Sequence, residues 1–148
     1  MQRRKFLSLS ALALTASALN LRAEDYRKSK PDVWTSHKVD DAIKKLYGTD
    51  KLVEKGVKLK IPKVASNGGA IPVNIKSDID AKSVALFQDT NPESTVAVFT
   101  IHKDSIIDLD VNIKMKASGK ITAVVEGKDG KLYAKTKGLE VALGGCEG

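Results

Sequence analysis

The sequence predicts an all-β protein: an immunoglobulin-like antiparallel β-sandwich with a short N-terminal helix and a flexible C-terminal arm. Runs of alternating apolar and polar residues follow one another through the second half of the chain, and turn-forming residues separate them at short intervals. Aromatic residues make up only 5% of the 148 residues. A core of Val, Ile, Leu and Ala is therefore expected, as in a small sandwich.

The first candidate strand is GVKLKIP, whose apolar residues from Val57 to Ile61 share one face while two lysines share the other. Six more candidate strands follow, at 73–76, 83–88, 95–100, 107–116, 120–127 and 132–143. The Asp129–Gly130 pair between the last two predicts a hairpin. Pro62 and Pro72 disfavour central sheet positions, because proline cannot donate a hydrogen bond to a strand ladder.

Residues 24–54 are predicted to form a leader and one short helix ahead of the sandwich. Residues 24–36 show no periodic pattern, whereas SHKVDDAIKKLYGTD places its apolar residues at helical spacing. Ser36 is positioned to cap the start of this helix, and Gly48 to end it. The sandwich domain is then expected over 55–143, with a glycine-rich cysteine arm at 144–148.

Residues 1–23 have the composition of an export signal. Arg3, Arg4 and Lys5 precede an apolar run diluted by Ser and Thr, and Ala23 provides a cleavage site. The paired arginines resemble a twin-arginine signal, which is used for proteins exported already folded. The apolar run is too short and too weakly hydrophobic for a permanent membrane anchor. We therefore predict cleavage after Ala23, and no membrane anchor afterwards.

The charge of the chain does not indicate a nucleic-acid partner. Loss of residues 1–23 removes four basic residues and no acidic residue, so the formal net charge falls from +7 to +3. The remaining lysines are dispersed, and few aromatic residues are available to stack on bases.

No recognisable catalytic or metal-binding motif occurs in the predicted domain. His37 and His102 lack an acidic partner at a ligand spacing. Asp104, Asp108 and Asp110 lack the glycine and the terminal glutamate of a calcium loop, so we interpret them as a solvated turn and strand edge. The SNGGA stretch is read as a turn, because no phosphate-loop lysine or helix pattern follows it. No metal and no cofactor are predicted.

The chemistry is therefore expected at the tail, where Cys146 is the single cysteine of the chain. It cannot form an intrachain disulfide, although export places it in an oxidising compartment. Gly144 and Gly145 form a joint with wide backbone freedom, and the three residues from Leu143 to Cys146 span roughly 10 Å.

A terminal thiol of this kind lacks the fixed base and oxyanion pocket of a thiol enzyme. Glu147 and the terminal carboxylate also disfavour the thiolate form. The residues thus describe a carrier whose thiol is loaded and unloaded by other proteins. The alternative is an exported β-sandwich interaction module that uses its cysteine only for an interchain disulfide.

The tail resembles the Gly-Gly-Cys-Gly-Gly arm of the SoxY family, which belongs to the thiosulfate-oxidising Sox system. The run VNIKMKASGKITAVVEGKDGKLYAKTKGLEVAL is similar to the last strands of the family, and SNGGAIPVNI, NPESTVAVF and the signal add to the likeness. The similarity extends over most of residues 40–148. Glu147 is a departure, because the family usually has glycine there; a carboxylate beside an anionic cargo is expected to repel it.

The resemblance implies that Cys146 is the attachment point for thiosulfate-derived sulfur, with Gly144, Gly145, Glu147 and Gly148 as the carrier arm. It implies a periplasmic, non-catalytic protein that forms a heterodimer with a SoxZ-like β-sandwich subunit. It also implies that the protein presents its cargo to three partner enzymes. SoxAX, a haem c enzyme, joins thiosulfate to the cysteine; SoxB, a dimanganese hydrolase, removes sulfate; and SoxCD, where present, oxidises the remaining sulfur.

Overall fold

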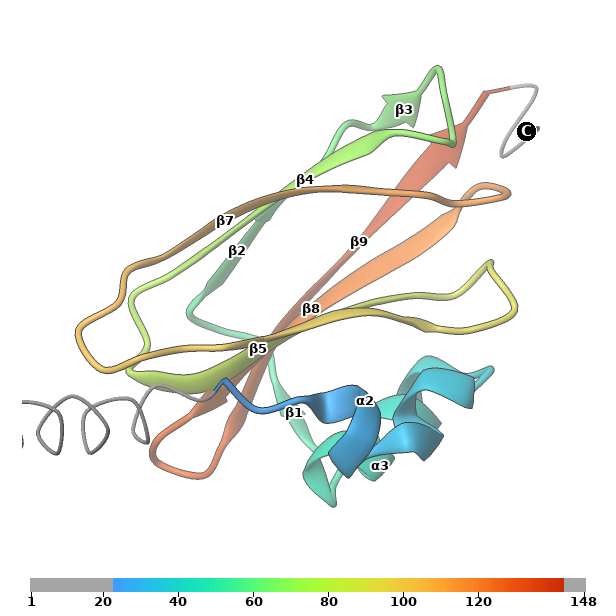
Figure 1. The fold of residues 1–148 in the computed structure, drawn as a ribbon. Helices are drawn as coiled ribbons and strands as arrows, with labels where there is room; N and C mark the ends of the chain where they lie inside the picture. Colours follow the sequence, from blue (N-terminus) through green and yellow to red (C-terminus); the bar gives the residue numbers. More distant parts are fainter. Residues whose placement is uncertain (1–22, 143–148) are drawn as a thin grey trace, which may run out of the picture.

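Two β-sheets pack face to face in a computed structural model that describes residues 23–142 (Figure 1). The larger sheet has the order β1-β9-β8-β5-β6, and β3 also pairs with β9. The smaller sheet has the order β2-β4-β7. Most neighbouring strands are antiparallel, and only β1 and β3 lie parallel to β9. The predicted all-β, immunoglobulin-like sandwich with a short helix is confirmed.

The strands of the larger sheet are β1 (Leu52–Val53), β3 (Val64–Ala65), β5 (Ala81–Gln88), β6 (Thr95–Thr100), β8 (Gly119–Gly127) and β9 (Leu132–Val141). Those of the smaller sheet are β2 (Val57–Lys60), β4 (Ile71–Ser77) and β7 (Ile107–Ile113).

The main core lies between the two sheets and follows from the alternation in the sequence. In β2, Val57 and Leu59 are buried while Lys58 and Lys60 are exposed. The same alternation in β4 buries three apolar residues, of which Ile71 and Ile75 are fully inaccessible. Each such side chain contributes about 1.5–3 kcal/mol to folding relative to an exposed one.

The N-terminal segment packs on the outer face of the larger sheet (Figure 1). It forms α2 (Tyr26–Ser29), the 3₁₀ helix η1 (Pro31–Thr35) and α3 (Val39–Tyr47). Its buried apolar side chains meet those of the sheet in a second cluster comprising Val33, Ala42, Ile43, Leu46, Ala85, Phe87, Val124, Leu132 and Ala134. One face of the sandwich is therefore covered by the chain itself.

The predicted cap of the helix is wrong at its start and correct at its end. The residue before α3 is Lys38, and Ser36 lies two residues further upstream, where its Oγ donates to Asp32 O at 3.0 Å. The carbonyl of Ser36 accepts hydrogen bonds from the N–H and the hydroxyl of Ser94. Ser36 thus joins the N-terminal segment to the start of β6. Gly48 ends the helix with a φ of 79°.

Two short strands were absent from the sequence prediction, and of the six strands predicted from 73 onward only the one at 95–100 has the predicted limits at both ends. β1 and β3 contain two residues each, which is too few for a periodic pattern. β7 ends at Ile113 and not at residue 116, because the amide of Met115 turns away to donate to Gly68 O.

Pro72 lies within β4, the central strand of the smaller sheet, although proline disfavours that position. The pairing of β2 with β4 extends only from Ser77 to Asn74, so Pro72 lies beyond the end of that ladder. The sheet is effectively two-stranded at this point.

The predicted hairpin between β8 and β9 is confirmed. Gly130 adopts a φ of 82°, and Gly127 N donates to Lys131 O at 2.9 Å across the turn. The hydroxyl of Tyr133 donates to the Asp129 carboxylate at 2.5 Å. This hydrogen bond lowers the pKa of Asp129 and raises the pKa of Tyr133.

We predict that Gly119→Ala destabilises the fold by about 1–3 kcal/mol, since a Cβ there would overlap Thr90 Cγ2 and Asp89 Oδ1. Gly138→Ala, on the neighbouring strand, is the matched control, because the nearest atom to its Cβ lies 3.8 Å away. Urea unfolding of both variants measures the difference. Equal stability of the two variants would contradict the packing described here.

Candidate functional site

The predicted site residues Gly144, Gly145, Cys146, Glu147 and Gly148 lie outside the described residues. The structure describes the chain as far as Ala142, immediately after β9. The contacts that hold the end of β9, from which the predicted arm extends, are therefore described as far as Ala142.

The end of β9 is held from two sides. Three consecutive amides donate hydrogen bonds: Glu140 N to Lys63 O at 2.9 Å, Val141 N to Ser118 Oγ at 2.8 Å and Ala142 N to Ala65 O at 2.9 Å. The four residues from Ala142 to Cys146 span at most about 14 Å in extended conformation. Covalent geometry therefore allows the Cα of Cys146 to lie at most about that far from Ala142.

The chain between β2 and β4 supplies one side of this attachment. β2 ends at Lys60, and after Pro62 the chain leaves the smaller sheet and forms β3, which pairs with Glu140 and Val141 of β9. Because proline cannot donate to a ladder, Pro62 favours this departure. A segment from one sheet thereby fixes the end of a strand of the other.

The SNGGA stretch is the turn that was predicted. The side chain of Asn67 accepts a hydrogen bond from Gly69 N at 2.8 Å, and strand β4 follows directly, without a helix. The carbonyl of Gly68 accepts from Met115 N, which joins this turn to the loop between β7 and β8. That loop contains Ser118, so both sides of the attachment are connected.

Gln88 organises a further loop, and the sequence prediction missed it. It is fully buried at the end of β5, where its Oε1 accepts from Thr90 N and Asn91 N, and its Nε2 donates to Glu93 O. Asn91 in turn bonds to the backbone of Lys114 and Lys116. The β5–β6 loop is thus tied to the β7–β8 loop, at the end of the sandwich where β9 finishes (Figure 1).

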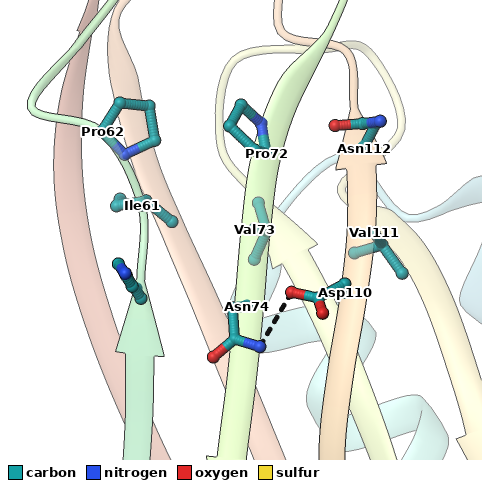
Figure 2. Close-up of a pocket in the computed structure, with 9 residues that line it drawn as sticks. Ile61, Pro62, Pro72, Val73, Asn74, Asp110, Val111 and Asn112 are labelled. Carbon is teal, nitrogen blue, oxygen red and sulfur yellow. Dashed lines mark hydrogen bonds between the residues drawn. The ribbon is translucent and has the colours of Figure 1, made fainter.

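A groove lies on the smaller sheet, where β2 departs from β4 (Figure 2). Ile61 and Pro62 line one side, Pro72 and Val73 the middle, and β7 the other side. The full lining is Lys60, Ile61, Pro62, Pro72, Val73, Asn74, Asp110, Val111 and Asn112. Pro62 directly precedes Lys63, whose carbonyl anchors Glu140. The groove therefore adjoins the attachment of the last strand.

Charged residues line the outer face of the smaller sheet. Asn74 donates from Nδ2 to Asp108 at 2.9 Å and to Asp110 at 2.8 Å, and Lys76 pairs with Asp108 at 2.9 Å. The hydrogen bonds from Asn74 and Lys76 lower the pKa of Asp108. These contacts agree with the interpretation of Asp108 and Asp110 as a solvated strand edge.

The remaining candidates are dispersed. His37 contacts Pro92 O through Nδ1 at 2.6 Å, and His102 lies in the loop between β6 and β7. Within residues 23–142, no group of three or more His, Cys, Asp or Glu is placed to hold a metal ion. The helices in the same range are all too short or too polar to cross a bilayer.

The fold and the anchored strand end define a class: a small immunoglobulin-like sandwich whose last strand is fixed shortly before a cysteine-bearing C-terminus. The model of the family described as sulfur oxidation protein SoxY matches residues 43–146. The chain therefore belongs to the SoxY family, and the matched range includes Cys146.

Solved structures agree with this assignment. The sulfur carrier protein SoxY from Chlorobium limicola f thiosulfatophilum is 27% identical, with a TM-score of 0.65 over 72% of this chain and 97% of that one. A superoxide reductase from Ignicoccus hospitalis, 14% identical, has a TM-score of 0.53 over 59% of this chain and 80% of its own. The second likeness shows the fold alone. No match was found among curated proteins.

We predict that Ser118→Ala loosens the attachment without unfolding the sandwich, because it removes the acceptor of Val141 N. A hydrogen bond of this type contributes about 1 kcal/mol, so exchange of the Val141 amide should accelerate about fivefold. Hydrogen exchange followed by NMR measures this rate. Ser105→Ala, in the exposed β6–β7 loop, is the control, and equal exchange in both variants would contradict the anchoring role.

Proposed function

We propose that this protein is a sulfur carrier that holds thiosulfate-derived intermediates covalently on Cys146 and catalyses no reaction itself. The match of the SoxY family model, which extends through Cys146, carries this proposal. The similarity to a sulfur carrier over nearly the whole length of that protein supports it. The carrier arm comprises Gly144, Gly145, Glu147 and Gly148.

The proposed chemistry needs partner enzymes to activate the thiol and to accept electrons. Loading forms a bond between Cys146 Sγ and the terminal sulfur of thiosulfate, which releases the thiol proton and two electrons to a haem c enzyme. Hydrolysis of the resulting thiosulfonate then releases sulfate and leaves a persulfide on the cysteine. Since the carboxylate of Glu147 beside the thiol disfavours the thiolate, an enzyme must supply the base.

The anchored end of β9 suits this role. A carrier must present its cargo to several active sites while its own domain stays outside them. The hydrogen bonds at Val141 and Ala142 hold the end of the strand from which the proposed arm extends. We propose that glycine at 144 and 145 serves the arm because glycine restricts backbone conformation least. A narrow glycine stalk also fits a channel little wider than a peptide backbone.

Family membership implies partners from the Sox system in general. We propose a SoxZ-like subunit as the partner in a heterodimer, SoxAX as the loading enzyme, SoxB as the hydrolase and SoxCD as a further oxidase. We also propose export by a twin-arginine signal at residues 1–23 and action in the periplasm, with the sandwich over 55–143 as the domain that carries the arm. The alternative, an exported module whose cysteine only cross-links two chains, remains the competing hypothesis.

The carrier proposal predicts a covalent adduct on the cysteine. Incubation of the mature chain with its SoxZ-like partner, SoxAX and thiosulfate should yield a mass increase that a thiol reductant reverses. The increase should be absent from Cys146→Ala, which serves as the control. Intact mass spectrometry measures both proteins. A disulfide dimer as the only modified species would favour the alternative.

We predict that Glu147→Gly accelerates loading, because a carboxylate beside the thiol repels the thiosulfate dianion. In water, removal of one such charge at close range should lower the activation free energy of loading by about 1 kcal/mol. This corresponds to a loading rate about fivefold higher. Initial loading rates by the cognate SoxAX at low and high salt measure the effect. Glu147→Gln separates charge from bulk, and unchanged or slower loading in both variants would show that Glu147 does not impede the reaction.

A further inference from the structure

Two exposed lysines lie on either side of the point where β9 ends. Lys63 directly precedes β3, and its carbonyl accepts a hydrogen bond from Glu140 N at 2.9 Å. Lys116 lies in the β7–β8 loop, two residues before Ser118, whose hydroxyl accepts from Val141 N at 2.8 Å. Each lysine is therefore next to one of the contacts that hold the end of the strand.

The backbone of Lys116 is held within its loop. Its N–H donates to Asn91 Oδ1 at 2.9 Å, and Asn91 Nδ2 donates to Lys114 O at 2.7 Å. Met115, between the two lysines, is fully buried. The side chain of Lys116 thus extends from a fixed segment, which keeps its ammonium group near the end of β9.

Neither lysine has an acidic partner within residues 23–142. The four ion pairs of that range involve other lysines, namely Lys28, Lys45, Lys76 and Lys128. Glu93 and Glu140 are also exposed at this end of the sandwich, but neither takes part in an ion pair of the same range. Two positive charges beside the strand end can therefore accept a carboxylate from outside the described part of the chain.

The predicted arm carries such a carboxylate. Glu147 is the single charged side chain among residues 143–148. It follows Ala142 by five residues, so the two Cα atoms lie at most about 17 Å apart, and a glycine-rich chain of this length has an r.m.s. end-to-end distance of roughly 12 Å. Ala142 N bonds to Ala65 O, and the Cα atoms of Ala65 and Lys63 are within about 7 Å of each other. The short tether thus gives the carboxylate a high effective concentration at the lysines.

We propose that the carboxylate of Glu147 pairs with the ammonium groups of Lys63 and Lys116, so that the unengaged carrier arm rests against the end of the sandwich. This inference rests on the proposed function, because it assigns a resting position to the carrier arm. The contact is an exposed ion pair and is therefore weak, so an enzyme that supplies its own cation can release the arm. While the arm is at rest, the pairing offsets the negative charge beside Cys146.

The pKa of Glu147 in the full mature chain, with Cys146 kept reduced, tests the proposal. NMR titration of the carboxyl carbon measures this pKa, and Glu147→Gln identifies the resonance by its loss. Lys63→Gln and Lys116→Gln should each raise the pKa, by about 0.2–0.7 for a pair of ordinary surface strength, because the carboxylate loses a stabilising cation. Salt at about 1 M should abolish the difference between the wild type and these variants.

Lys103→Gln is the matched control, because Lys103 is an exposed lysine without an ion pair in the β6–β7 loop, at the opposite end of the sandwich. Effects of Lys63→Gln and Lys116→Gln that are no larger than that of Lys103→Gln would overturn the proposal, whereas a larger effect of either supports it. A pKa of Glu147 that depends on protein concentration would assign the contact to a second copy of the chain and would also overturn it.

Failure of the resting contact is distinguishable from failure of the carrier function. The titration uses this chain alone and needs no partner enzyme. The carrier function is judged by the mass adduct on wild-type Cys146, which forms or fails to form whatever the pKa of Glu147.

Discussion

The hydrogen bonds at the end of β9 are the constraint on which the account of this protein depends. Strands β8 and β9 form the longest pairing of the sandwich, and β3 and Ser118 hold the final residues of β9 from both sides. A tail attached to a frayed strand would have an undefined origin. Here the origin is fixed at Ala142, so the range of the cysteine is set by four residues of backbone.

Two prolines help to produce both the attachment and the groove beside it. Pro62 follows the last paired residue of β2, and Pro72 lies in β4 beyond the reach of that pairing. The chain therefore crosses from the smaller sheet to the larger one, where β3 pairs with β9. The same departure opens the groove between Pro62 and Pro72 (Figure 2). This change of sheet thus connects the two layers of the sandwich at the end where β9 finishes.

The sequence was sufficient for features that depend on local pattern. Alternation identified the long strands. Gly48 predicted the end of a helix and Gly130 predicted a hairpin turn, and both adopt the positive φ values that these positions require. It was insufficient where long-range contacts decide. β1 and β3 exist only because β9, distant in sequence, provides their partner, and Ser36 bonds to Ser94 instead of capping the helix. Cys146 was predicted as the site because it is the single cysteine of the chain and follows two glycines, whereas Ser118 in an ordinary turn gave no signal.

The most direct test of the carrier role is the chemical state of the C-terminal peptide in cells oxidising thiosulfate. Peptide mapping of the protein isolated without reductant should locate thiosulfonate or persulfide sulfur on Cys146. Cys146 found only as a free thiol, or only in a disulfide between two chains, under active thiosulfate oxidation would contradict the account.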